Sequence, residues 1–172
     1  HHGGAFFRED GFQLFGEDEV RASGALLSTI CHYKITNYID FTIPYTWQVG
    51  RVEVDDASIE EAIAVTGDNC VMTVFLRSIE MAKDKESMSW AKEALVFELK
   101  NMYPGCEITT SEHCKEKAIV INVAMANSDA SMYVALIPLG EKNILVTHTF
   151  SEDDWVADLY FTTAISEMTK NI

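Results

Sequence analysis

Hydrophobic residues dominate three consecutive stretches in the second half of the chain, each separated from the next by a short polar turn. The stretches span residues 118–125, 132–139 and 144–150. The first two are apolar on both faces, which is typical of strands that lie in the middle of a sheet and are covered on both sides. The intervening turns, at residues 127–129 and 140–143, have the length and composition of hairpin turns. This pattern predicts an antiparallel meander.

Two further segments carry apolar residues at helical spacing. Residues 87–103 form the first, and Pro104 and Gly105 bring it to an end. The second follows the meander, with Ser151 predicted as its N-cap and Asp154 at the capping-box position. The predicted core-facing positions are Ala91, Leu95, Leu99 and Met102 in the first helix and Trp155, Leu159, Ile165 and Met168 in the second.

The first half of the chain shows the composition and the period of two that are typical of strands. Residues 26–43 are rich in β-branched and aromatic side chains and end at Pro44. Residues 48–54 predict a second short strand, and residues 70–79 alternate and predict another. Strands grouped together with helices kept apart indicate an α+β fold, in which helices pack on an antiparallel β-sheet.

A capping box predicts one additional helix between these strands. Ser58 can accept a hydrogen bond from a free backbone amide while Glu61 reaches back. We therefore expect a short helix that begins at Ser58 and ends near Gly67.

The chain divides into three parts. Residues 1–4, His-His-Gly-Gly, look like the remnant of a purification tag. Residues 5–25 form an extension with too many aromatic residues for a disordered tail, and we expect it to pack on the domain or on a second copy in a homodimer. Residues 26–172 are expected to form a single α+β domain. Because tagging can remove a natural leader, both the bacterial cell envelope and the cytoplasm stay open as locations.

Charge narrows the range of partners. The chain carries 13 basic and 27 acidic residues, a formal net charge of −14. Such a charge repels phosphate backbones and anionic lipid surfaces, so we expect neither nucleic acid nor a membrane surface as partner. No apolar run reaches the roughly 18 residues that a membrane span requires. A basic or metal-bearing partner is compatible with this charge, although solubility explains the charge more simply.

The sequence contains no familiar catalytic motif. GxGxxG, the phosphate-binding loop, HExxH and GxSxG are all absent. The spacing of the four cysteines matches no zinc motif, and free, mostly buried thiols are expected, although Cys106 and Cys114 can pair in an oxidising compartment. We therefore expect no cofactor.

Two groups of residues have the side chains that ligate metals. One is acidic and suits a cation bound by oxygen, although a solvated loop explains it more simply. The other contains soft ligands, although a turn that happens to contain a thiol explains it more simply. The groups are Glu53, Asp55 and Asp56, and Cys106, His113 and Cys114.

Other candidates are aromatic or basic side chains near predicted strands. Tyr33, Tyr45 and Trp47 are candidate binding residues, with a place in the core or at the sheet edge as the alternative. His148 lies in a strand ahead of Asp154 and is a candidate general base, although a structural histidine is the commoner case.

Both ends of the domain resemble a known group of proteins. Residues 38–44, Tyr-Ile-Asp-Phe-Thr-Ile-Pro, with Trp47 soon after, resemble the opening of PsbP-like and DcrB-like domains, a group that includes the Ran-binding Mog proteins. Residues 133–140 and 143–150, followed by a helix, resemble the closing hairpin and helix of these domains. The resemblance implies an αβα sandwich with a binding or accessory role, and structural roles for Pro44 and Trp47. The aromatic extension and the scarcity of basic residues depart from the group.

Three functions therefore stay open. The first is a non-enzymatic binding or accessory domain that acts in protein–protein interaction, as a chaperone or in assembly. The second is a module for a small ligand or a divalent metal. The third is an unrecognised hydrolase or isomerase, which requires His148 or His113 beside a carboxylate in an open cleft.

Overall fold

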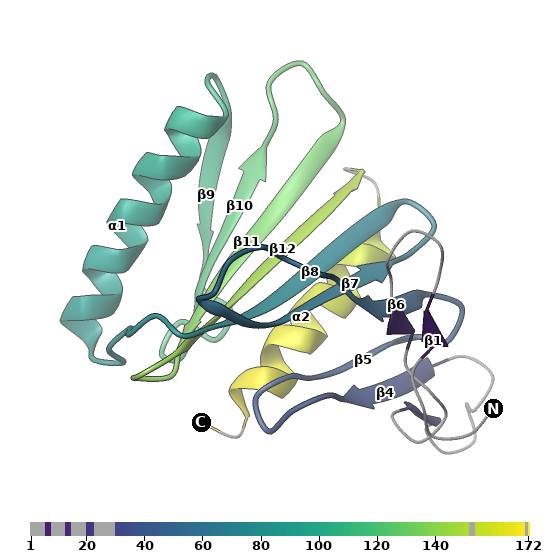
Figure 1. The fold of residues 1–172 in the computed structure, drawn as a ribbon. Helices are drawn as coiled ribbons and strands as arrows, with labels where there is room; N and C mark the ends of the chain where they lie inside the picture. The colour runs from purple at the N-terminus through teal and green to yellow at the C-terminus, as the bar shows by residue number, and fades with distance from the viewer. Residues whose placement is uncertain (1–5, 8–12, 15–19, 23–29, 152–153, 171) are drawn as a thin grey trace.

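A computed structural model describes residues 6–7, 13–14, 20–22, 30–151, 154–170 and 172. In this part of the chain the main element is a nine-stranded sheet in which neighbouring strands pair antiparallel (Figure 1). In spatial order its strands are β1 (Phe6–Phe7), β2 (Gln13–Leu14), β6 (Gln48–Arg51), β7 (Ile59–Thr66), β8 (Cys70–Arg77), β12 (Asn143–Ser151), β11 (Ala130–Pro138), β10 (Ile119–Ala124) and β9 (Glu107–Ser111).

A smaller sheet and two helices complete the described part of the fold. The small sheet consists of β3 (Val20–Ala22), β4 (Ile30–Lys34) and β5 (Asp40–Pro44), and the helices are α1 (Lys85–Met102) and α2 (Trp155–Thr169). Helix α1 covers one face of the large sheet, and α2 lies with β4 and β5 on the other (Figure 1). The structure therefore confirms the predicted α+β class with helices packed on an antiparallel sheet. Neither helix is both long and apolar enough to cross a membrane.

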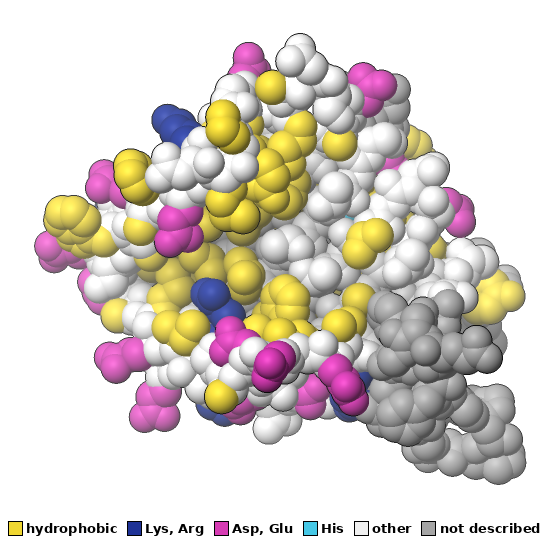
Figure 2. Space-filling model, turned by 45° about the horizontal axis from the view of Figure 1, so that its top comes forward, with side chains coloured by type: hydrophobic (Ala, Val, Ile, Leu, Met, Phe, Trp, Pro, Cys, Tyr) yellow, Lys and Arg dark blue, Asp and Glu magenta, His cyan; other side chains and the backbone are white. Residues whose placement is uncertain are grey.

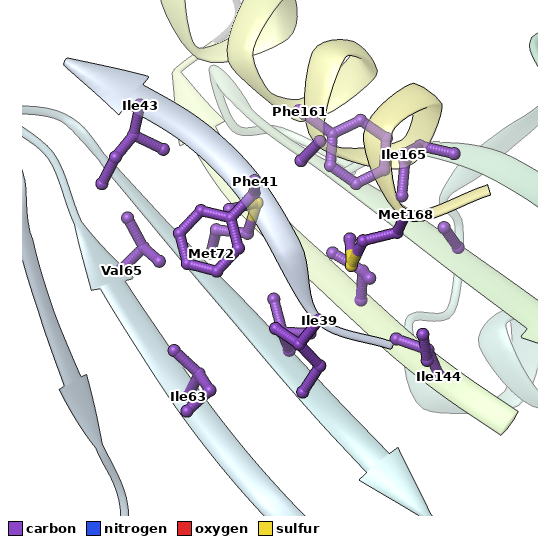
Figure 3. Packing of buried hydrophobic residues seen from close by; sticks show 14 of the residues in the cluster. Ile39, Phe41, Ile43, Ile63, Val65, Met72, Ile144, Phe161, Ile165 and Met168 are labelled. Carbon is purple, nitrogen blue, oxygen red and sulfur yellow. The ribbon is translucent and has the colours of Figure 1, made fainter. Parts of the chain in front are cut away.

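The larger core lies between the large sheet and the layer that contains α2. Figure 3 shows Phe41 from β5, Met72 from β8 and Phe161 from α2 in this core, and all three are fully buried. The smaller core lies beneath α1, where Met88 and Leu99 are buried against strands β10 and β11. The meander strands β10 and β11 thus have a core on each side, as their continuous apolar sequence predicts.

The strand predicted at residues 26–43 is a hairpin in the structure. Residues 26–29 lie outside the described residues, and the rest forms β4 and β5 joined by a turn. Thr36 makes the turn, because its Oγ1 accepts hydrogen bonds from the backbone amides of Tyr38 and Ile39, both at 3.0 Å. The short strand predicted at residues 48–54 is confirmed as β6, which ends at Arg51.

The helix predicted from Ser58 to Gly67 is wrong, since this segment is strand β7. Ser58 donates its hydroxyl to Asp56 Oδ1 at 2.7 Å and its backbone amide to the same oxygen at 2.9 Å, so it does not cap a helix. Pairing of β7 with β6 and β8 then buries Ile63 and Val65, whose branched side chains suit a strand.

The last helix begins three residues later than predicted. Ser151 is the final residue of β12, and Asp154 is the N-cap, accepting a hydrogen bond from the Ala157 amide at 3.0 Å. Trp155 and Leu159 were predicted to face the core but are 73% and 45% exposed. They lie two residues before and after Ala157, which places them about 200° around the helix from the buried stripe. That stripe consists of Ala157, Phe161, Ala164, Ile165 and Met168.

The helix predicted at residues 87–103 is confirmed as α1, but its last apolar residue is not in the core. Leu99 is 4% exposed, whereas Met102 in the last turn is 65% exposed. The described strands of the N-terminal extension pair with the same chain, β2 with β6 and β3 with β4. A homodimer through this extension stays a prediction.

Candidate functional site

The three aromatic residues predicted to bind a partner lie in different environments. Tyr33 is buried and stacks on Phe41 with ring centroids 5.6 Å apart, and burial raises its pKa to about 12. Trp47 is also buried but lines a shallow pocket of 370 Å³ together with Asp68 and Trp155. Tyr45 is 55% exposed in the turn after Pro44. Their role in binding stays a prediction.

The predicted acidic cluster lies in the exposed loop between β6 and β7. Glu53, Asp55 and Asp56 are all exposed. The hydrogen bonds that Asp56 accepts from Ser58 lower the pKa of its carboxyl group. Among the described residues, three metal-ligating side chains lie close together elsewhere, and none of the three comes from this loop.

The predicted soft-ligand group is divided between the two faces of the sheet. His113 Nε2 lies 3.0 Å from the Thr162 carbonyl oxygen and 2.9 Å from Ser166 Oγ, so it packs against α2. Cys114 contacts the same helix, whereas Cys106 packs on the core beneath α1. All four cysteines are free thiols.

His148 is fully buried among aromatic rings. It makes edge contacts with Trp47, Phe150 and Phe161, and neither ring nitrogen has a hydrogen-bond partner. Burial lowers its pKa to about 4, with the charges of Asp154 and Asp158 acting weakly in the opposite direction. It is therefore neutral near pH 7 and has no open cleft at its nitrogens.

A cluster that the sequence did not reveal lies where β4, β5 and α2 meet. His32, Asp40 and Glu167 bring three potential metal-ligating atoms within 4.8 Å of one another. His32 Nε2 contacts Asp40 Oδ1 directly and lies 3.4 Å from Glu167 Oε2, while Thr42 Oγ1 donates to the same glutamate oxygen at 3.1 Å. Burial raises the pKa of the Glu167 carboxyl group, and the charge of Asp40 adds to this effect.

A groove lies on the opposite side of the sheet, between the start of α1 and strands β9 and β10. Its volume is 550 Å³, within the range of ligand pockets. Its apolar floor consists of Met88 and Ile119, which belong to the core beneath α1. It is also lined by Ala118 and Val120, which belong to the core on the α2 side, and by Thr110 and Ser111. The charged lining residues are Lys83, Lys85, Lys92, Lys115, Glu112 and Glu116.

The lysines of this groove are largely unpaired. Lys115 forms an exposed ion pair with Glu112 at 3.1 Å. Lys83, Lys85 and Lys92 form no ion pair with another described residue. Four lysines and two glutamates leave a surplus of two positive charges, in a chain whose net charge is −14. Packing of α1 on the sheet brings residues 83–92 beside residues 110–120, so sequence patterns did not reveal the groove.

Comparison with known proteins finds a similarity in structure but none in sequence. No protein-family model matches the chain, and no curated protein matches its sequence. Among solved structures, it is similar to the solution structure of cyanobacterial PsbP (CyanoP) from Synechocystis sp. PCC 6803, with a TM-score of 0.56 and 14% sequence identity. The match covers 85% of this chain and 95% of that one. At this identity the likeness concerns the fold, and it confirms that the chain has a PsbP-like fold.

Proposed function

We propose that this chain is a non-enzymatic binding domain that takes up an acidic segment of a partner protein in the lysine-lined groove between α1, β9 and β10. One observation carries the proposal. Four of the 13 basic residues of a strongly acidic chain surround one apolar floor. Because the rest of the surface repels negative charge, the groove is where an acidic partner meets the weakest repulsion.

The shape and chemistry of the groove favour a segment that is both acidic and apolar. The floor offers the edges of Met88 and Ile119, which can cover an aliphatic side chain. Lys83, Lys85 and Lys92 can each donate to a carboxylate without first breaking an ion pair with a described residue. A segment in which aliphatic and acidic residues alternate would match both the apolar floor and the lysines.

The non-enzymatic part of the proposal is supported by the surroundings of the two candidate histidines. Aromatic rings enclose His148, and the Nε2 of His113 is engaged by a carbonyl and a hydroxyl oxygen. A hydrolase or isomerase that uses either residue needs a carboxylate beside it in an open cleft. The PsbP-like fold is also compatible with an accessory role.

The test is fluorescence anisotropy with a fluorescein-labelled synthetic peptide in which glutamate and leucine alternate. The Lys85→Glu/Lys92→Glu variant should weaken binding by at least about tenfold, since two attractive charges become repulsive. Lys34→Glu/Lys100→Glu changes the net charge by the same amount at exposed positions outside the groove and should weaken binding less than about twofold.

Two results would contradict the proposal. One is failure of the unmodified chain to bind the peptide at low salt. The other is an equal loss of affinity in both variants, which would indicate non-specific attraction. A peptide of glutamine and leucine should bind weakly, because it leaves the lysines without a counter-charge.

A further inference from the structure

We infer that His32, Asp40 and Glu167 form a binding site for a divalent transition-metal ion, with Zn²⁺ as the best match. The three donor atoms come from β4, β5 and α2 and lie within 4.8 Å of one another. The site is separate from the lysine-lined groove, because it belongs to the face of the sheet that carries α2. It therefore does not depend on the function proposed above.

Local structure brings the three side chains together. In the β4–β5 hairpin His32 is paired with Thr42 and Lys34 with Asp40, so His32 and Asp40 are diagonal neighbours on one face. Helix α2 packs along β5 and places Glu167 beside them. Thr42 holds this carboxylate by its hydroxyl group at 3.1 Å. Such support of a ligand from a neighbouring residue is a common feature of metal sites.

The spacing suits a small ion. Two ligands of a tetrahedral zinc ion, with bonds of about 2.0–2.1 Å, lie roughly 3.3 Å apart. His32 Nε2 and Glu167 Oε2 are 3.4 Å apart. Asp40 contacts His32 directly, so the ion would take the place of the proton between them, and the carboxylate would turn aside by rotation about its side-chain bonds. The fourth position would be left to water.

The types of ligand atom indicate which class of ion would bind. One imidazole nitrogen and two carboxylate oxygens suit zinc and other first-row divalent ions better than Ca²⁺ or Mg²⁺, which prefer oxygen ligands alone. The two carboxylates balance the ionic charge of 2+. Access is open, since the side chains of His32, Asp40 and Glu167 are 29%, 17% and 25% exposed.

The test is isothermal titration calorimetry with Zn²⁺, Mn²⁺ and Ca²⁺ on a chain in which His1→Ala and His2→Ala remove the ligands of the tag-like N-terminus. Zn²⁺ should bind with a stoichiometry of one. His32→Gln, Asp40→Asn and Glu167→Gln should each weaken Zn²⁺ binding by at least about tenfold, and Thr42→Val by a smaller factor. Co²⁺ in place of Zn²⁺ should give visible absorption bands that disappear in the His32→Gln variant.

The matched control is His113→Ala/Cys114→Ser, which removes a half-buried histidine and thiol outside the proposed site and should leave Zn²⁺ binding unchanged. Thermal unfolding without metal checks that each variant is folded. Absence of Zn²⁺ binding, or binding that survives all three ligand substitutions, would overturn the proposal and leave a simple ion pair. Loss of binding only in the control variant, or a preference for Ca²⁺, would overturn it as well.

Discussion

The two faces of the large sheet differ in how completely they are covered. On one face α2 and the β4–β5 hairpin together enclose a core in which Phe41, Phe161 and Ile165 are fully buried. On the other face α1 is the covering helix, and among the largest fully buried side chains of the described residues only Ile121 belongs to its core. The first face therefore carries most of the burial, and the second has room for a groove.

The surface of the α1 side reflects this difference. Helix α1 turns Trp90 and Phe97 away from the sheet, and these side chains are 67% and 68% exposed. Figure 2 shows hydrophobic side chains gathered in a hollow while acidic side chains are spread over the surrounding surface. The comparison places most of the buried core on the α2 side, whereas the groove lies on the α1 side.

The sharpest test of this division is to remove one large side chain from each core. Phe161 is fully buried and stacks on Tyr133 at 4.8 Å, so Phe161→Ala should cost about 3–5 kcal/mol in the free energy of unfolding. Leu99→Ala, on the buried face of α1, should cost about 2 kcal/mol. Urea denaturation measures both values. Equal losses would show that the two cores matter equally.

Acid should weaken the α2 side through His148. Its pKa is about 4 in the folded protein and about 6.5 in the unfolded chain, so the unfolded chain takes up the proton first. The stability that depends on this residue is complete above about pH 6.5 and is lost as the pH falls toward 4, by about 3 kcal/mol in total. Urea denaturation at several pH values measures this loss.

A matched variant isolates the histidine from other acid effects. His148→Phe keeps an aromatic ring in the core and should flatten the dependence of stability on pH in this window. His113→Gln replaces the half-buried histidine beside α2, and this variant should still lose stability as the pH falls. If the His148→Phe variant lost as much stability in acid as the unmodified protein, other groups would be responsible for the acid effect.

A smaller effect is expected where backbone and core approach closely. A Cβ atom at Gly67 would lie 2.6 Å from Cys70 Sγ and 2.7 Å from Trp47 Cε2. Gly67→Ala should therefore destabilise the α2 side by about 1–3 kcal/mol, as overpacking does. Thr66→Ala, at the exposed neighbouring position, is the control for thermal unfolding. An unchanged melting temperature in Gly67→Ala would mean that the Trp47 ring moves freely.

The smallest effect is expected on the outer surface of α1. Trp90→Gln/Phe97→Gln removes two exposed rings and should change the free energy of unfolding by less than about 0.5 kcal/mol. Chemical denaturation at two protein concentrations measures it. A larger loss that depends on concentration would show that a second copy covers this helix.

Sequence patterns predicted the parts of the fold that depend on local periodicity. The meander follows from runs of apolar residues and α1 from apolar residues at helical spacing, and Pro44 ends β5 as expected. The prediction of a helix at Ser58 was wrong because the serine hydroxyl is hydrogen-bonded to Asp56. The prediction of an N-cap at Ser151 was wrong because strand β12 continues to that residue. In both cases a competing local contact or a strand partner decided the outcome.

The two sites depend on contacts that no local pattern encodes. Thr42 and Glu167 are 125 positions apart, and only the packing of α2 along β5 joins them. Likewise, the lysines of the groove come from α1, from the residues just before it and from the segment that follows β9. Charge counts showed that basic residues are scarce, but only the three-dimensional structure showed that several of them gather in one place.

Strand β9 ends the described sheet, and its composition bears on how the protein behaves in concentrated solution. A terminal strand offers backbone groups to which another chain can add a strand, the first step toward aggregation. Here the strand is five residues long, and Glu107, Thr109 and Thr110 are exposed along it. Together with the mutual repulsion of chains that each carry a net charge of −14, this polar edge discourages the growth of fibrils from that end of the sheet.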